Sequence, residues 1–219
     1  MTQGCTLTGG FHVGKENPPK FDDIRRDGRD GDVAKNNYPD NSINRYQRKL
    51  LTMGTQSIPP DFRQISRHDG LFKECVHDAY KSKDKPLEPS VCSQCGAVFH
   101  EGRWQWREVP ANAHRLQCPA CHRIHDHYPA GFLTMKGEFF RAHRNEIMHL
   151  VHNHEQCERK EHPLQRIMAE EEKEGATLVT TTDIHLARGI GEALHHAYHG
   201  ELEFHYNPEQ NLLRVIWTH

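Results

Sequence analysis

Two matched pairs of cysteines have the spacing of a metal site. Cys92 and Cys95 form one Cys-x-x-Cys pair, Cys118 and Cys121 form a second, and 22 residues separate the pairs. Each pair can present two thiolates from one tight turn. Two such turns, brought together by a β-hairpin, supply the four soft ligands of a tetrahedral Zn²⁺ site. The sequence therefore predicts one structural zinc ion at these four residues.

The residues around the pairs support this interpretation and offer one alternative ligand. Gly96 follows the first pair directly and Pro119 lies inside the second, which suits tight turns. His122, next to Cys121, is the alternative fourth ligand. A disulfide is disfavoured because the first residues show no secretory signal, and a thioredoxin-like motif uses one pair, not two. Four protein ligands leave no open position, so we expect this zinc ion to hold structure and do no chemistry.

The composition narrows the class of protein. The chain has 219 residues, of which 35% are hydrophobic, against roughly 45–50% in an ordinary globular chain. Part of the chain is therefore expected to lack a core of its own. The formal net charge of −2 gives no broad basic surface for nucleic acid. No apolar run approaches the roughly 20 residues of a membrane span, so we expect a cytoplasmic protein without membrane contact.

Breaker residues and apolar periodicity divide the chain into four regions. Residues 1–70 are expected to form an extended or disordered arm without regular structure, apart from a short helix at 42–53. A short helix and linker follow at 71–91. The zinc ribbon is expected at 92–136, and an α+β domain occupies 137–219.

The last region has an α-α-β-α-β-β pattern, so the predicted fold class is α+β. Helices are expected at 137–158, at 164–173 and, after a cap at Thr182 or Asp183, up to residue 199. Strands are expected at 176–182, 201–206 and 212–217. Gly189 and Gly191 lie inside the third predicted helix, which indicates close helix packing and argues against a dinucleotide-binding loop.

Several stretches are similar to a known family. They are residues 92–106, 118–126, 129–131, 143–147, 161–168 and 181–194, and together they resemble an uncharacterised bacterial zinc-ribbon family over about 92–217. Some members are labelled as ATPases, but this chain has no phosphate-binding loop. Paired Cys-x-x-Cys turns ahead of a small α+β domain also resemble the archaeal and eukaryotic adaptor that accompanies the large ribosomal subunit out of the nucleus. That resemblance implies ribosome binding.

We therefore expect a zinc-ribbon protein that binds structured RNA, above all ribosomal RNA, as a stress, hibernation or quality-control factor. Local clusters of arginine and lysine can neutralise phosphates even when the net charge is near zero. Trp104 and Trp106 alternate as in a strand and could stack on bases, although covering the small zinc core is the favoured interpretation. The candidate contacts are Arg25, Arg26, Arg29, Arg45, Arg48, Lys49, Arg103, Trp104, Trp106, Arg107, Arg115 and Arg123.

Two other functions stay open. The ribbon could dock on DNA or on the transcription machinery as a regulator. A metal-dependent enzyme could use histidines at helical spacing, namely His149, His152 and His154 with Cys157, and His195, His196 and His199. No His-Glu-x-x-His or Gly-x-Ser-x-Gly motif is present, so no catalytic residue and no small-molecule substrate are predicted.

Overall fold

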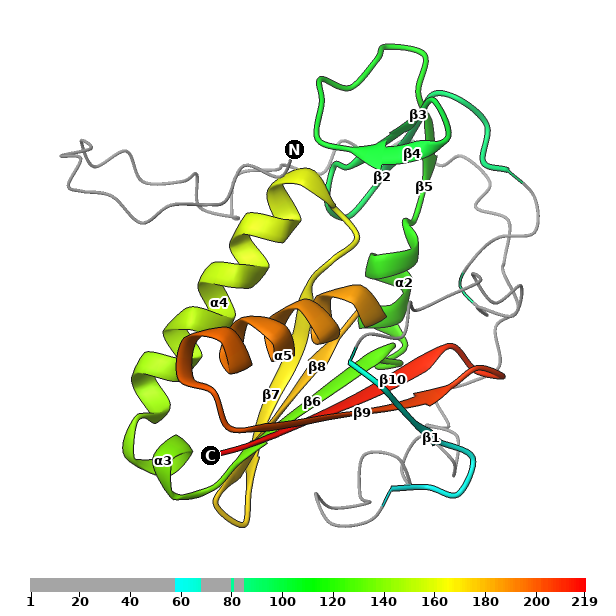
Figure 1. Ribbon diagram of the computed structural model, residues 1–219. Coiled ribbons are helices and arrows are strands. Elements are labelled where there is room, and N and C mark those ends of the chain that lie inside the picture. Colours follow the sequence, from blue (N-terminus) through cyan, green and yellow to red (C-terminus); the bar gives the residue numbers. More distant parts are fainter. Residues whose placement is uncertain (1–57, 68–79, 81–84) are drawn as a thin grey trace, which may run out of the picture.

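The computed structural model describes residues 58–67, 80 and 85–219. These residues form a mixed α/β structure with a four-stranded and a six-stranded sheet (Figure 1). The elements are β1 (Arg63–Ile65), β2 (Ser90–Cys92), β3 (Val98–His100), β4 (Arg103–Gln105), β5 (His114–Leu116), α2 (Pro119–His125), β6 (Gly131–Lys136), α3 (Glu138–Ala142), α4 (Arg144–Glu161), β7 (Ile167–Lys173), β8 (Ala176–Thr181), α5 (Ile184–Tyr198), β9 (Glu201–Asn207) and β10 (Leu212–Thr218). Among the described helices, none is long and apolar enough to cross a membrane.

The six-stranded sheet forms the body of the protein. Its strand order is β1-β9-β10-β6-β8-β7, and only β10 and β6 pair in parallel. Helices α4 and α5 cover one face of this sheet (Figure 1). The main core lies between this sheet and the two helices. The sheet contributes alternate strand residues such as Leu133, Val179, Val215 and Trp217. Burial of these side chains is the main stabilising contribution to the body.

Four C-terminal elements lie close to their predicted positions. Strands β8, β9 and β10 and helix α5 lie at the predicted positions. The Asp183 carboxylate accepts hydrogen bonds from the backbone N–H groups of His185 and Leu186, at 2.7 and 3.3 Å, and so caps α5. The predicted close packing is confirmed at Gly191, which is buried against Val215.

The helix predicted at 137–158 is divided into α3 and α4. The break lies at His143, whose backbone φ is −115°. Both the backbone N–H and Nδ1 of His143 bond to the Phe139 carbonyl, each at 3.0 Å. The helical backbone bonds continue through this residue, so the break lies in the dihedral angles of His143.

The helix predicted at 164–173 is wrong. Residues 167–173 form β7, an edge strand that pairs antiparallel with β8. Glu174 and Gly175 both have positive φ, 53° and 75°, which makes the β7–β8 connection a two-residue hairpin. The glutamates of this segment stay exposed, as predicted, but they lie on a sheet edge, where charges discourage further pairing.

Two region boundaries also differ from the expectation. β6, at the end of the predicted 92–136 ribbon, is an inner strand of the six-stranded sheet. Within the predicted arm, β1 pairs with β9, and Phe62 packs against Phe132 and Leu212. These apolar contacts explain why the end of the arm is structured. The helix predicted at 42–53 lies outside the described residues. Of the short helix and linker predicted at 71–91, residues 71–79 and 81–84 also lie outside them.

Close packing at Gly191 predicts the sign of the change in the free energy of unfolding when this glycine is replaced by alanine. A Cβ atom there would lie 2.7 Å from Val215 Cγ1 and 3.3 Å from Leu202 Cδ1. Replacing glycine by alanine in a helix ordinarily stabilises by about 0.5–1 kcal/mol, whereas overpacking a core costs about 1–3 kcal/mol. We expect Gly191→Ala to lower the free energy of unfolding, measured by denaturant titration of the full chain, by about 1 kcal/mol.

Gly189→Ala is the matched control. The atoms nearest to its added Cβ would be those of the His154 imidazole, a side-chain end that can move aside. Its stability should be unchanged or slightly raised. A stabilised Gly191→Ala protein would contradict the packing described here.

Candidate metal centre

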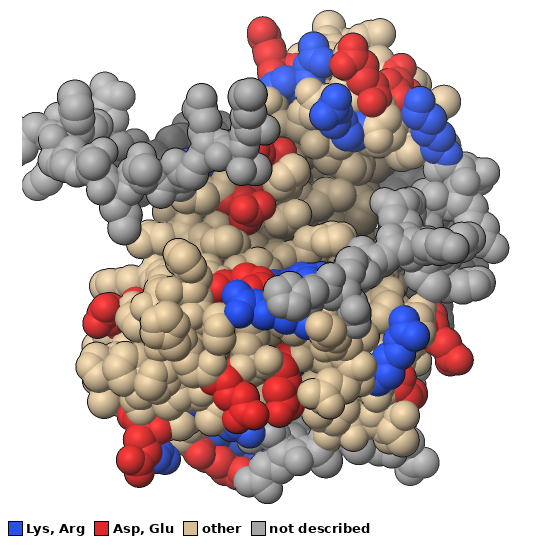
Figure 2. Space-filling model, viewed as in Figure 1, with Lys and Arg blue, Asp and Glu red and all other residues tan. Residues whose placement is uncertain are grey.

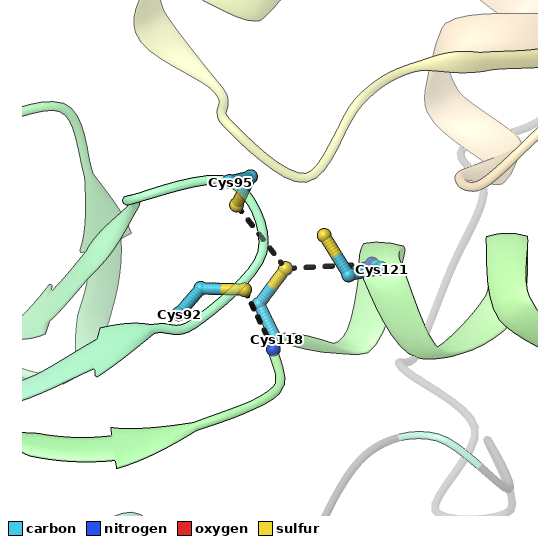
Figure 3. Close-up of side chains that lie close together, drawn as sticks. All are labelled: Cys92, Cys95, Cys118 and Cys121. Atoms are coloured by element: carbon cyan, nitrogen blue, oxygen red, sulfur yellow. Dashed lines mark hydrogen bonds between the residues drawn. The ribbon is translucent and has the colours of Figure 1, made fainter. Parts of the chain in front are cut away.

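The four cysteines of the two pairs meet in one cluster. Their Sγ atoms all lie within 4.8 Å of one another, and they point toward a common centre from two separate segments (Figure 3). The Cys95 and Cys118 Sγ atoms are 3.7 Å apart. Tetrahedral metal–sulfur bonds of about 2.3 Å would place sulfur atoms about 3.8 Å apart, so this donor set fits one metal ion.

The turn between β2 and β3 holds the first pair. Cys92 is the last residue of β2, and its N–H donates to the Ala97 carbonyl at 2.8 Å. The Gly96 N–H donates to the Cys92 carbonyl at 3.0 Å, and Gly96 has a φ of +77°. This left-handed conformation favours glycine, so Gly96 closes the turn that brings Cys95 back toward Cys92.

The second pair lies at the start of α2. Cys118 is the N-cap residue and Pro119 follows it, a common arrangement at helix starts. The first pair therefore comes from a hairpin turn and the second from a strand–helix junction, which differs from the two similar turns expected. Parallel pairing of β2 with β5 sets Cys92 opposite Leu116 and so brings Cys118 beside Cys92.

Arg166 is the functional residue that the ligand spacing did not reveal. It follows α4, outside the cysteine-bearing segments, and is 5% exposed. Its Nη2 donates to Cys95 Sγ at 3.0 Å and its Nη1 to Cys121 Sγ at 3.3 Å. One guanidinium thus contacts one thiol of each pair. Because four thiolates and a divalent ion would carry a charge of −2, this cation offsets part of the buried charge.

The cysteine thiols differ in pKa. Hydrogen bonds from the Cys118 thiol and from Arg166 outweigh burial and lower the pKa of Cys95 to about 4. Donation of that hydrogen bond, together with burial, raises the pKa of Cys118. Burial raises the pKa of Cys121 to about 11. Because the pKa values of Cys118 and Cys121 are raised, all four cysteines become thiolates together only when a further cation besides Arg166 is bound.

Apolar side chains cover the cysteine cluster. Trp104 and Leu164 pack against it, which confirms that Trp104 covers the cysteine core. Trp106 is 39% exposed, and its Nε1 donates to the Arg159 carbonyl, at the end of α4, at 2.6 Å. The Arg166 guanidinium carbon lies 5.8 Å from the centre of the Trp106 ring. The four-stranded sheet and the cysteine cluster, residues 90–121, form a cysteine module. This module contacts the body through Trp106 and through Leu164, which packs on the cluster.

The predicted nucleic-acid contacts fall into three groups. Arg103, Arg107 and Arg115 are exposed on the small sheet and its β4–β5 loop. Arg123 is only 2% exposed; its guanidinium donates to the Tyr128 carbonyl and lies 4.5 Å from the centre of the Tyr80 ring. Arg123 therefore cannot contact phosphate in this structure, and that part of the prediction is wrong. The remaining group lies outside the described residues: Arg25, Arg26, Arg29, Arg45, Arg48 and Lys49.

The histidines do not form a second metal site in the part of the chain that the structure describes. The four cysteines are the one group of potential ligands found close together there. His152 bonds to Glu170 and His195 to the Gly200 carbonyl. His122 lies against Asp126, with Nε2 3.3 Å from a carboxylate oxygen, and not among the four sulfur atoms.

Because known proteins give no match, the functional proposal rests on the cysteine site. No family model, no curated protein and no solved structure matches this chain.

Serine substitution of a ligand should remove the metal. Cys118 is fully buried in the cluster, and a serine hydroxyl is a poor substitute for a thiolate. We expect plasma mass spectrometry to find one bound metal ion per wild-type chain and under about a tenth of that in Cys118→Ser, given a metal contribution of about 10–16 kcal/mol in zinc-finger peptides. The control is Cys157→Ser, which changes a half-buried cysteine on α4 outside the cluster. Equal metal content in both variants would contradict the assignment.

Proposed function

We propose that this chain is a cytoplasmic zinc protein in which one Zn²⁺ ion, held by Cys92, Cys95, Cys118 and Cys121, stabilises a ribbon-type module. The observation that carries the proposal is the convergence of four cysteine sulfur atoms within 4.8 Å. An all-thiolate tetrahedral set with no open position is typical of structural zinc. Under this proposal the ion supplies folding free energy and performs no reaction.

We further propose that the module binds structured RNA, above all the ribosome, in stress, hibernation or quality control. Support comes from the exposed arginines at positions 103, 107 and 115 and from the partly exposed Trp106. Figure 2 shows basic side chains over the small sheet at the top of the view, interspersed with acidic ones. Such local charge can contact phosphates, and an exposed indole can stack on a base.

Two features of the amino-acid sequence add to the RNA-binding proposal. The basic residues of the region 1–57 would add phosphate contacts beyond the module. The chain also resembles a bacterial zinc-ribbon family and the ribosomal export adaptor, and the second resemblance implies ribosome binding.

Salt-dependent sedimentation tests RNA binding. We expect the full-length chain in lysates of stressed cells to migrate with ribosomes or a subunit at low salt and to leave them at high salt, because phosphate contacts release counterions. The triple variant Arg103→Gln, Arg107→Gln, Arg115→Gln should bind more weakly. Its salt dependence should fall by about 0.7–0.9 in log–log slope for each phosphate that the variant no longer neutralises.

The control removes three exposed charges from the body: Arg63→Gln, Arg141→Gln and Lys173→Gln. This variant should sediment like the wild type. Migration near the top of the gradient at both salt concentrations would contradict ribosome association. Selective recovery of DNA or RNA polymerase in a pull-down would favour the transcriptional alternative.

A further inference from the structure

Arg166 belongs to the body through its backbone. Its N–H donates to Thr182 Oγ1 at 2.9 Å, and its carbonyl accepts from the Thr182 N–H at 2.9 Å. Thr182 follows β8 and directly precedes Asp183, which caps α5. The Thr182 hydroxyl also donates to the Leu164 carbonyl at 2.6 Å. The segment 163–166 is therefore fixed to the junction between the β7–β8 hairpin and the core helix α5.

The same residue belongs to the metal centre through its side chain. Nε donates to the Pro163 carbonyl at 2.7 Å, and the two terminal nitrogens donate to Cys121 and Cys95. The planar guanidinium thus uses all three of its nitrogens and bridges the two cysteine pairs. A lysine ammonium would supply the charge without this fixed geometry.

The buried guanidinium depends on the cysteine sulfur atoms for two of its hydrogen bonds. A bound divalent ion would hold the four sulfur atoms at one centre, with one acceptor for Arg166 in each pair. When the ion leaves, the two cysteine pairs are no longer held at a common centre, and the guanidinium loses its fixed pair of acceptors. Opening of segment 163–166 would then return the guanidinium to water.

Two neighbouring contacts would open with it. Leu164 covers the cysteine cluster, and the Trp106 indole bonds to the Arg159 carbonyl while its ring lies beside Arg166. Both contacts join the cysteine module to the segment from the end of α4 to β7. Neither Leu164 nor Trp106 is a metal ligand. Both contacts therefore form only while Arg166 and the cysteine cluster hold their positions.

We propose that metal binding and docking of the cysteine module onto the six-stranded body are one coupled event, with Arg166 as the positioning residue that couples them. This inference rests on the zinc site of the proposed function. It adds that the zinc centre is shared between module and body and so controls how the two are held together.

Amide hydrogen exchange of the wild-type full chain tests the coupling without a substitution. Exchange is compared with Zn²⁺ bound and after its removal by a chelator. We expect protection to fall at least tenfold in 92–121 and also in 163–166 and at the end of α4, whereas β9 and β10 keep theirs. Loss of protection confined to 92–121 would overturn the coupling.

Variants at position 166 test the positioning role. The affinity for Zn²⁺, measured by competition with a chromophoric chelator, should fall about 10- to 100-fold in Arg166→Gln, the range typical of residues that hydrogen-bond to metal ligands. Arg166→Lys should restore part of the wild-type affinity. The control is Arg159→Gln, an exposed arginine seven residues earlier whose carbonyl contact with Trp106 is retained.

These measurements separate the coupling from the zinc assignment. Absence of zinc from the full chain would overturn both the proposed function and the coupling. Bound zinc with wild-type affinity in Arg166→Gln would overturn the coupling alone. If Arg166→Gln fails to fold, the exchange experiment on the wild type decides the question.

Discussion

The contact of one buried guanidinium with two thiols joins the cysteine cluster to the six-stranded body. Arg166 donates to Cys95 and Cys121 while its backbone is paired with Thr182 in the body. A buried cation costs free energy unless a matching charge lies beside it. The cysteine cluster supplies that charge, and the six-stranded sheet holds the arginine in place. Site and fold therefore depend on each other.

Local patterns predicted the ligands because metal turns are local structures. The two Cys-x-x-Cys pairs, Gly96 and Pro119 each specify a turn within a few residues, and the four sulfur atoms do meet. Arg166 could not be found in this way. It lies 71 residues from Cys95 and 45 from Cys121, and only the tertiary fold brings it to them. A single buried arginine has no sequence pattern of its own.

The fold was predictable where periodicity and caps agreed, as for α5, β9 and β10. It was not predictable at 167–173, because a short segment with three apolar residues and a run of glutamates suits either an exposed helix or an edge strand. The positive φ values of Glu174 and Gly175 show that the decisive signal was the hairpin turn. Charge alone also misled at Arg123, which is buried against Tyr80 and Tyr128.

The central claim is that four cysteine sulfur atoms hold one zinc ion. X-ray absorption at the zinc edge of the full-length protein reports the ligands of the bound ion directly. We predict a single shell of four sulfur atoms at about 2.3 Å. A shell that includes nitrogen at about 2.0–2.1 Å, as coordination by His122 would give, or the absence of stoichiometric zinc, would contradict the account.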